Sequence, residues 1–256
     1  MSNYHLEIKI ISRGKGQSIA HSMSYITGRN LSECNGKMYH HQRNDVLYCK
    51  IFQPSNAPPE YSDLQTLCDA INNAEKRRDS RTARQFIGSL PNELPLIENV
   101  KIVHKFVEHN LVSKGLCAVV AIHEGRNPDD PSKNNPHVHI IVSTRTVGPD
   151  GFSEKKAYEY NRKNWIWIWR KRWADVQNHA YERNGLDIRV THESLKDQGV
   201  DRAPIPHLSR ADWEKEQRGE HTLAGDKRRE IEDRNKERMC YHQSTRERKR
   251  TWTLTR

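Results

Sequence analysis

Long hydrophobic runs are missing from this sequence. The longest apolar cluster, around 140–143, is only as long as a strand, whereas a helix that crosses a bilayer needs roughly 20 apolar residues. The first five residues, Met1–His5, have neither the charged start nor the apolar stretch of a signal peptide. We therefore expect a protein of the cytoplasm without a membrane segment.

Cysteine is also scarce and irregularly placed. The sequence has 5 cysteines, an odd number, and no Cys-x-x-Cys pair. A disulfide framework or a thiolate zinc site would have paired, closely spaced cysteines. The pattern excludes both kinds of site and agrees with a reducing compartment.

Positive charge is in excess. Among 256 residues there are 43 Lys and Arg against 33 Asp and Glu, which gives a net charge of +10, and only 34% of residues are hydrophobic. Such a charge favours an anionic partner, most often nucleic acid. After Leu208 charged residues dominate and apolar ones are isolated. We expect a domain over 1–208 and a charged tail over 209–256 that is helical or partly disordered.

The hydrophobic periodicity alternates between strand and helix patterns. Ser18 is a plausible N-cap and Gly28 a plausible end for a short helix that includes Tyr25. Trp165, Trp169 and Trp173 form a stripe that a helix over 164–183 would bury in the core. The pattern predicts an α+β fold, with helices packed on an antiparallel sheet. The expected strands are 4–11, 85–90, 116–123, 137–144 and 187–190, and the other expected helices are 63–76 and 100–111.

Three histidines are placed to share one face of the sheet. His137 and His139 alternate along a strand, so their side chains point the same way about 7 Å apart. His123 ends the preceding strand, and pairing of the two strands would bring it to the same rim. Three neutral imidazoles form an open metal site that leaves positions for substrate oxygen. Without that pairing, the histidines are ordinary residues of a polar sheet face.

Tyr25 is the candidate nucleophile, on the short helix that follows a basic loop. A tyrosine hydroxyl is a poor nucleophile at neutral pH because its ordinary pKa is about 10. A divalent cation that holds a phosphodiester makes the phosphorus more electrophilic, so that a phenol can attack it.

The sequence resembles the MobA/MobL family of conjugative relaxases, the MobQ type among the HUH endonucleases. The resemblance runs from residue 4 to about 208, with its motifs in the family's order. The matching motifs are 4–13 with Gly16-Gln17-Ser18, the Tyr25 helix, 75–80 through Ala83-Arg84, 90–94, the histidine cluster, Trp169-Arg170-Lys171-Arg172-Trp173, and 197–202 with Ile205-Pro206-His207.

The resemblance implies a metal-dependent, strand-specific nick in the origin of transfer of a plasmid. Tyr25 matches the nucleophile, which becomes joined to the 5′ phosphate of single-stranded DNA. His123, His137 and His139 match the ligands of a divalent metal ion, Mg²⁺ or Mn²⁺. Glu75 matches an acidic position near the site.

One position departs from the family pattern. The family usually has a glutamate directly after the arginine of Ala83-Arg84, and here that residue is Gln85. An amide can orient a hydroxyl or a metal ligand by hydrogen bonding, but it cannot accept a proton. If Gln85 has replaced a base, then Glu75, a water or the metal-bound environment takes the proton.

Basic residues near these motifs are candidates to hold DNA phosphates, with a solvated surface as the alternative. As a set they fit a groove for single-stranded DNA, whose affinity falls steeply with salt. They are Arg13, Lys15, Arg77, Arg78, Arg84 and Arg145. The resemblance further implies hairpin DNA at the origin, accessory mobilisation proteins and a type IV secretion coupling protein as partners in a bacterial cytoplasm.

Two other functions remain open. An HUH replication initiator or transposase usually has its tyrosine after the histidine pair, whereas Tyr25 precedes it. A non-catalytic, origin-binding derivative of a relaxase is kept open by Gln85.

Overall fold

The computed structural model describes residues 4–127, 130–131, 134–206 and 208–254. These form two compact units, one that ends at His192 and one that begins at Glu193. The first unit carries all the candidate site residues named above.

A five-stranded antiparallel sheet forms the centre of the first unit, as the sequence pattern predicts. The strand order is β1-β5-β7-β6-β4, and every neighbouring pair is antiparallel. The strands are β1 (Leu6–Ser12), β4 (Val46–Phe52), β5 (Arg81–Ser89), β6 (Ala118–His123) and β7 (His137–Ser143).

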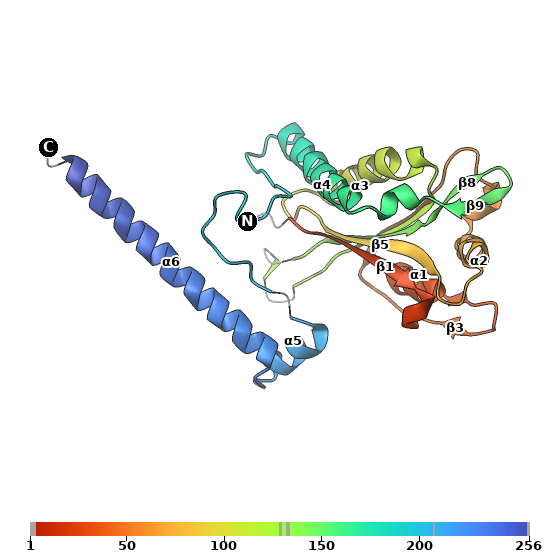
Figure 1. Cartoon of the computed structure of the whole chain (residues 1–256), viewed down its shortest axis with the longest axis horizontal. Coiled ribbons are helices and arrows are strands. Elements are labelled where there is room, and N and C mark those ends of the chain that lie inside the picture. Colours follow the sequence, from red (N-terminus) through yellow and green to blue (C-terminus); the bar gives the residue numbers. More distant parts are fainter. Residues whose placement is uncertain (1–3, 128–129, 132–133, 207, 255–256) are drawn as a thin grey trace. The chain divides into compact units, whose positions relative to one another are not determined.

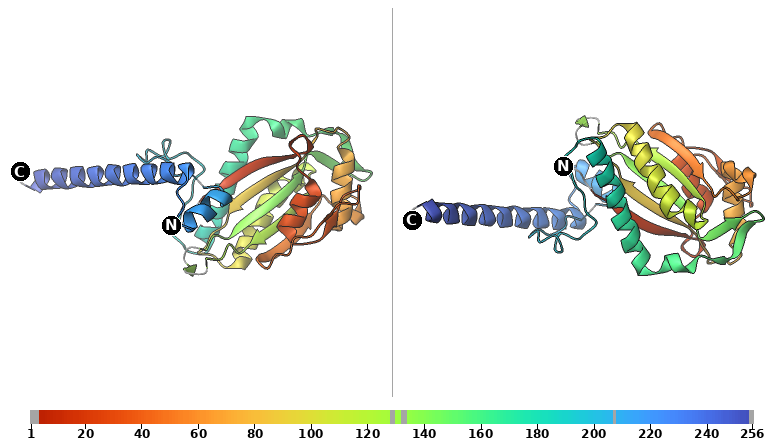
Figure 2. Two further views of the ribbon diagram at one scale, coloured as in Figure 1. Left: turned by 90° about the horizontal axis from the view of Figure 1, so that it is seen from below. Right: turned by 90° about the horizontal axis from the view of Figure 1, so that it is seen from above.

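Helices cover both faces of this sheet (Figures 1 and 2). Helices α3 (Leu96–Asn110) and α4 (Lys163–Arg183) pack on one face, and α1 (Ile19–Thr27) and α2 (Leu64–Ala74) pack on the other. Because side chains alternate along a strand, each strand contributes to both of these cores. The α1 side is the face to which the three histidines belong.

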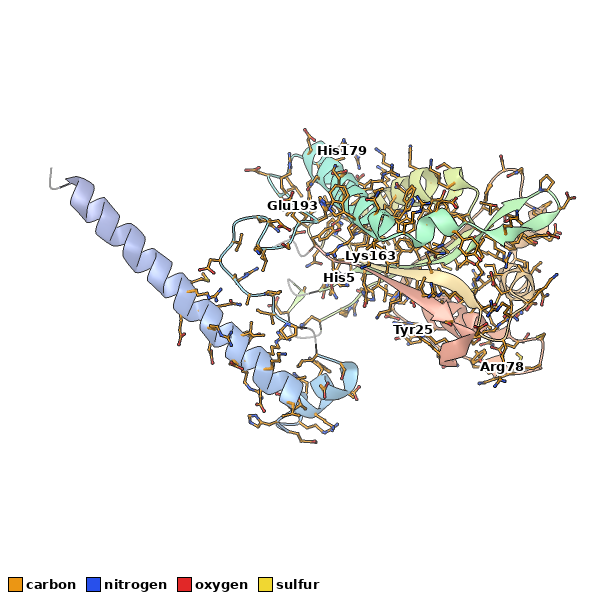
Figure 3. All side chains as sticks on the ribbon, in the orientation of Figure 1. His5, Tyr25, Arg78, Lys163, His179 and Glu193 are labelled. Atoms are coloured by element: carbon orange, nitrogen blue, oxygen red, sulfur yellow. The ribbon has the colours of Figure 1, made fainter. Side chains whose placement is uncertain are left out.

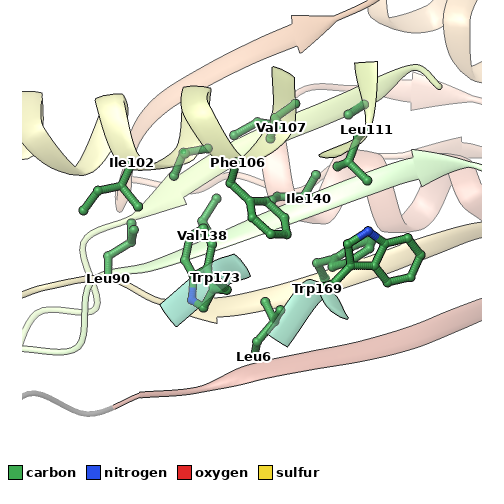
Figure 4. Close-up of a cluster of buried hydrophobic side chains, with 14 of the residues drawn as sticks. Leu6, Leu90, Ile102, Phe106, Val107, Leu111, Val138, Ile140, Trp169 and Trp173 are labelled. Atoms are coloured by element: carbon green, nitrogen blue, oxygen red, sulfur yellow. The ribbon is translucent and has the colours of Figure 1, made fainter. Parts of the chain in front are cut away.

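Two of the three tryptophans in the predicted stripe lie in the core, as their spacing predicts, and the third, Trp165, is half-buried against it. Trp169 and Trp173 are almost completely buried and pack against Phe86 and Phe106 (Figure 4). A Cβ atom on Gly88 would lie 2.9 Å from the Trp173 ring, so only glycine allows this close approach of helix and strand.

The caps of α1 are also those predicted. The Ser18 side chain accepts a hydrogen bond from the backbone N–H of His21 at 3.1 Å, and Gly28 ends the helix in the left-handed conformation. These two signals fix the register in which α1 presents Tyr25.

The predicted strand over 187–190 is wrong. The side chain of Asn178 on α4 instead binds both the backbone N–H and the carbonyl of Val190 at 2.8 Å. The sheet edge is taken by β4, which the sequence pattern does not reveal because exposed and half-buried residues follow no strict alternation there.

The remaining elements of this unit are the strands β2 (Leu31–Ser32), β3 (Met38–Tyr39), β8 (Arg145–Gly148) and β9 (Gly151–Lys156), and the 3₁₀ helices η1 (Arg13–Lys15), η2 (Pro59–Ser62), η3 (Val112–Lys114) and η5 (Tyr158–Asn161).

The second unit is helical, with α5 (Arg210–Gln217) and α6 (Leu223–Leu254). The Asn235 side chain binds the backbone of Ala203 on both sides, at 2.8 and 2.9 Å, and Arg238 pairs with Asp201 at 2.8 Å. Segment 201–203 thus packs with α6, so this compact unit starts upstream of the expected boundary at 208. Across the described residues, no helix combines the length and apolarity that a membrane span needs.

Candidate functional site

Three histidines converge on the α1 side of the sheet. In the β6–β7 pairing His123 lies opposite His137 and Ala121 lies opposite His139, so the three side chains share one face. Each offers one ring nitrogen, and these three atoms lie within 4.8 Å of one another. The strand register therefore produces the cluster that the spacing suggests.

Hydrogen bonds from outside the cluster orient two of the rings. His123 donates from Nε2 to the carbonyl of Ile26 at 2.7 Å, and its buried Nδ1 has no hydrogen-bond partner among the described residues. His137 donates from Nδ1 to the carbonyl of Asn135 at 2.8 Å. Each ring then keeps one nitrogen lone pair for a metal ion.

Burial keeps two of the rings neutral. It lowers the pKa of His139 to about 3, with further lowering by His123 and His137, and it also lowers the pKa of His123. Neutral imidazole is the form that binds metals. An orphaned buried nitrogen and three imidazoles on one face, two of them kept neutral by burial, fit a divalent cation.

Gln85 contacts the third ring. Its side-chain amide lies 3.4 Å from His139 Nδ1, and the amide oxygen and nitrogen exchange places by a 180° rotation. With the oxygen toward the ring, Gln85 accepts from Nδ1–H and leaves the other ring nitrogen for the metal. The residue thus lies behind a metal ligand.

Tyr25 projects from α1, and 41% of its surface is exposed. The guanidinium of Arg43 lies 4.7 Å from the centre of its ring, and the ring of His41 packs edge-on at 5.6 Å. Arg43 is held by Asp45 through two hydrogen bonds of 2.8 and 2.5 Å, which lower the pKa of the Asp45 carboxyl to about 2. This cation beside the tyrosine was missed in the sequence, because a polar segment without periodicity gives no signal of its contacts.

Glu75 lies elsewhere in the unit. Its carboxylate is 2% exposed and contacts Arg145, Lys156 and the Thr144 hydroxyl at 2.8, 2.8 and 3.0 Å. Burial raises its pKa, but these three partners outweigh burial and hold the pKa below its ordinary value. Thr144 is five residues along the chain from His139, which is about 16 Å at the rise of a strand. Glu75 thus holds a buried cluster of cations at this distance from His139, and a role for it in the reaction stays a prediction.

The six basic candidates separate into two groups. Arg13 binds the carbonyls of Asn72, Glu75 and Arg77 at the end of α2, Arg145 pairs with Glu75, and Arg84 is buried and binds Asn161. These three guanidiniums have structural partners. The exposed candidates are Lys15, Arg77 and Arg78, and DNA contact by them stays a prediction.

The model of the MobA/MobL family matches residues 17–218. The chain belongs to the MobA/MobL family. This confirms the resemblance seen in the sequence motifs.

Relatives with mobilisation names share this part of the chain. The probable mobilization protein MobA of Bifidobacterium longum is 28% identical over 251 residues, covering 81% of this chain and 43% of that protein. Mobilization protein A of Escherichia coli is 29% identical over 245 residues, covering 88% of this chain and 32% of that protein. This MobA/MobL chain thus spans less than half the length of either relative.

A solved structure has the same fold. A chain from work on the molecular basis of vancomycin resistance transfer in Staphylococcus aureus superimposes with a TM-score of 0.68. It is 26% identical in sequence and covers 75% of this chain and 100% of its own. The α+β architecture expected from the sequence pattern is therefore that of a solved protein.

Proposed function

We propose that this MobA/MobL chain is a relaxase, which nicks one DNA strand at the origin of transfer of a mobilisable plasmid. One observation carries the proposal: three histidines converge on the sheet face covered by α1, the helix that presents Tyr25. Net positive charge supports an anionic DNA substrate. Family membership supplies the class of reaction.

In the proposed reaction the Tyr25 hydroxyl oxygen attacks the phosphorus of a phosphodiester. A bond forms between that oxygen and the 5′ phosphate, and the bond to the 3′ oxygen breaks, so that the 3′ oxygen takes up a proton and leaves as a hydroxyl. His123, His137 and His139 would hold a Mg²⁺ or Mn²⁺ ion, which polarises a phosphoryl oxygen and offsets negative charge. Arg43 stabilises the phenolate of Tyr25 as its proton leaves.

Neither Glu75 nor Gln85 is suited to accept the proton of the Tyr25 hydroxyl. Glu75 has its carboxylate occupied by Arg145, Lys156 and Thr144, and the amide of Gln85 has no basic group. The tyrosine is 41% exposed, so we assign its proton to solvent water. Gln85 acts in this scheme as a positioning residue for His139.

The proposed partners follow from the reaction. The substrate is single-stranded DNA next to a hairpin at the origin, in the bacterial cytoplasm. Accessory mobilisation proteins and a type IV secretion coupling protein complete the proposed machinery.

The proposal is tested with a labelled oligonucleotide that carries the plasmid origin. With Mn²⁺ the wild-type chain should form an adduct that survives denaturing electrophoresis, and with EDTA it should not. The double variant His137→Ala and His139→Ala should lose the adduct but still shift the oligonucleotide in a native gel. Equal adduct in Mn²⁺ and in EDTA would rule out the metal site.

A second function is favoured by Gln85 alone. If the amide leaves the site too weak to nick, the chain binds the origin as a non-catalytic relaxase derivative. The same experiment separates the two functions, because a native shift without any adduct in Mn²⁺ would identify a binder.

A further inference from the structure

A row of aromatic rings runs along the exposed side of α1, starting from Tyr25. His21 precedes Tyr25 by four residues, so the two side chains lie on the same face of the helix. The ring of His41 contacts both, at centroid distances of 5.6 Å to Tyr25 and 4.9 Å to His21. The ring of Tyr39, on β3, continues the row at 5.2 Å from His21.

Each end of this row carries a cation. Arg43 lies 4.7 Å from the centre of the Tyr25 ring, and Lys37 lies 5.1 Å from the centre of the Tyr39 ring. Beyond Tyr39 the surface is hollowed into a cavity of about 600 Å³. Its lining includes the cations Arg13, Lys37 and Lys76, the carboxylates Glu33 and Glu75, and the start of α1. The aromatic row thus leads from the proposed nucleophile to a cavity in which cations outnumber carboxylates.

These rings are open to solvent rather than packed in the core. His21 and Tyr25 are exposed, and Tyr39 and His41 are half-buried. By contrast, the tryptophans Trp169 and Trp173 on the other face of the sheet are buried. Solvent-facing aromatic rings with cations at their ends are the composition of a single-stranded DNA path, because bases stack on rings and phosphates pair with cations. A double helix would not offer its base faces to such a row.

We propose that the row Tyr25–His41–His21–Tyr39 is the path of the unpaired strand next to the nick, with its bases stacked on the rings. The proposal rests on the proposed relaxase function and names the residues that hold its substrate. Arg43 and Lys37 contact phosphates at the two ends of the row. The strand then continues into this cavity, toward the surface on which Arg78 lies. Figure 3 labels Tyr25 and Arg78 on the α1 and α2 side of the unit, and His179 on the α4 side.

Two oligonucleotides with the same phosphates separate stacking from charge. One is a labelled 12-residue oligo-dT, and the other is an abasic oligomer of equal length, both measured by fluorescence anisotropy at pH 8 in EDTA so that no nick forms. His21 is neutral at this pH because burial, followed by His41 and Lys37, lowers its pKa. A loss of binding on substitution of His21 is then a loss of ring surface and not of charge.

The variants are His21→Ala and Tyr39→Leu. Leucine keeps the apolar packing of Tyr39 but has no flat face on which a base can stack. Trp167→Ala on α4 is the control, because Trp167 is an exposed aromatic residue that packs on His192, away from the row. Stacking of one base on an aromatic ring corresponds to roughly a 5- to 150-fold change in affinity. We expect a loss in this range for oligo-dT with each row variant, less than a twofold change for the abasic oligomer, and no change with the control.

The outcomes bear on the path and on the nick separately. Equal losses of affinity for both oligomers, or no loss for either, would overturn the stacking path. An unchanged thermal unfolding transition establishes that each variant is folded. Binding to oligo-dT needs no nick, so a chain that discriminates the two oligomers but forms no adduct would refute the relaxase function and keep the path. A chain that forms the adduct but does not discriminate them would refute the path alone.

Discussion

His123 donates a hydrogen bond from its Nε2 to the backbone carbonyl of Ile26, at 2.7 Å. One partner is a member of the histidine cluster and the other is the neighbour of Tyr25 on α1. The two parts of the proposed site are thus joined by a single bond between a sheet and a helix. Because the bond uses Nε2, it also leaves the buried Nδ1 as the nitrogen that faces a metal ion.

Removal of the Gln85 side chain should weaken metal binding. Loss of a hydrogen-bond partner behind a metal ligand typically costs 10- to 100-fold in affinity, so we expect Gln85→Ala to lower the Mn²⁺ affinity by about that factor. Gln85→Glu should instead tighten it, since a carboxylate is a stronger acceptor for His139 Nδ1–H. Isothermal titration with Mn²⁺ measures both variants.

If Gln85 acted on Tyr25 rather than on His139, the result would differ. Gln85→Glu would then raise the nicking rate at saturating Mn²⁺ and leave the Mn²⁺ affinity unchanged. Such an outcome would contradict the positioning role.

Gly125 lies against the Asn135 carbonyl that accepts the hydrogen bond of His137. Its φ is +58°, and a Cβ atom there would collide with the carbonyl oxygen of Asn135, which is the acceptor for His137 Nδ1–H. We expect Gly125→Ala to displace this carbonyl and to lower Mn²⁺ affinity by about tenfold. Gly185→Ala is the matched control, because Gly185 also has a positive φ, +69°, but a Cβ atom there meets no atom within 4 Å. Equal Mn²⁺ affinity in the two variants would show that the loop does not orient the ligand.

Glu75 should matter for stability and not for metal binding. Breaking a buried ion pair leaves its partners uncompensated and typically costs 3–5 kcal/mol, so we expect Glu75→Gln to lower the free energy of unfolding by about 3 kcal/mol. Mn²⁺ affinity should stay within about twofold of wild type. Chemical denaturation and titration of the same samples measure both, and a large drop in metal affinity without loss of stability would restore Glu75 to the metal site.

The same carboxylate predicts a pH dependence. The pKa of Glu75 in the folded protein lies below its ordinary value of 4.5, so the unfolded chain takes up the proton first as the pH falls. The stabilisation by Glu75 is then fully present above about pH 4.5 and is lost as the pH drops through the folded pKa. Wild type should lose more stability than Glu75→Gln between pH 5 and pH 3, and parallel pH profiles would contradict this account.

Local signals in the sequence predict much of the fold. Ser18 and Gly28 bound α1 because capping depends on residues within one turn, and the spacing of Trp169 and Trp173 predicts their burial. The alternation of His137 and His139 predicts a shared face, which the β6–β7 register then joins to His123.

Contacts between distant segments could not be predicted in this way. Glu75 meets Arg145 across 70 positions of the chain. The Arg43–Asp45 pair is local, but only the tertiary fold places Arg43 beside the Tyr25 ring. The sequence pattern also predicts a strand at 187–190 and misses the edge strand β4. Tertiary packing, which the local pattern does not show, decides which segment pairs with the sheet.

Tyr25 is the proposed nucleophile of a metal-dependent nick. The most direct measurement is mass spectrometry of the adduct after digestion with protease and nuclease, in wild type and in Tyr25→Phe. We expect the nucleotide mass on the α1 peptide at Tyr25, and no adduct in Tyr25→Phe, although that variant should bind the origin oligonucleotide with unchanged affinity because only a hydroxyl is lost. A nucleotide mass on another residue, or an undiminished adduct in Tyr25→Phe, would contradict the account.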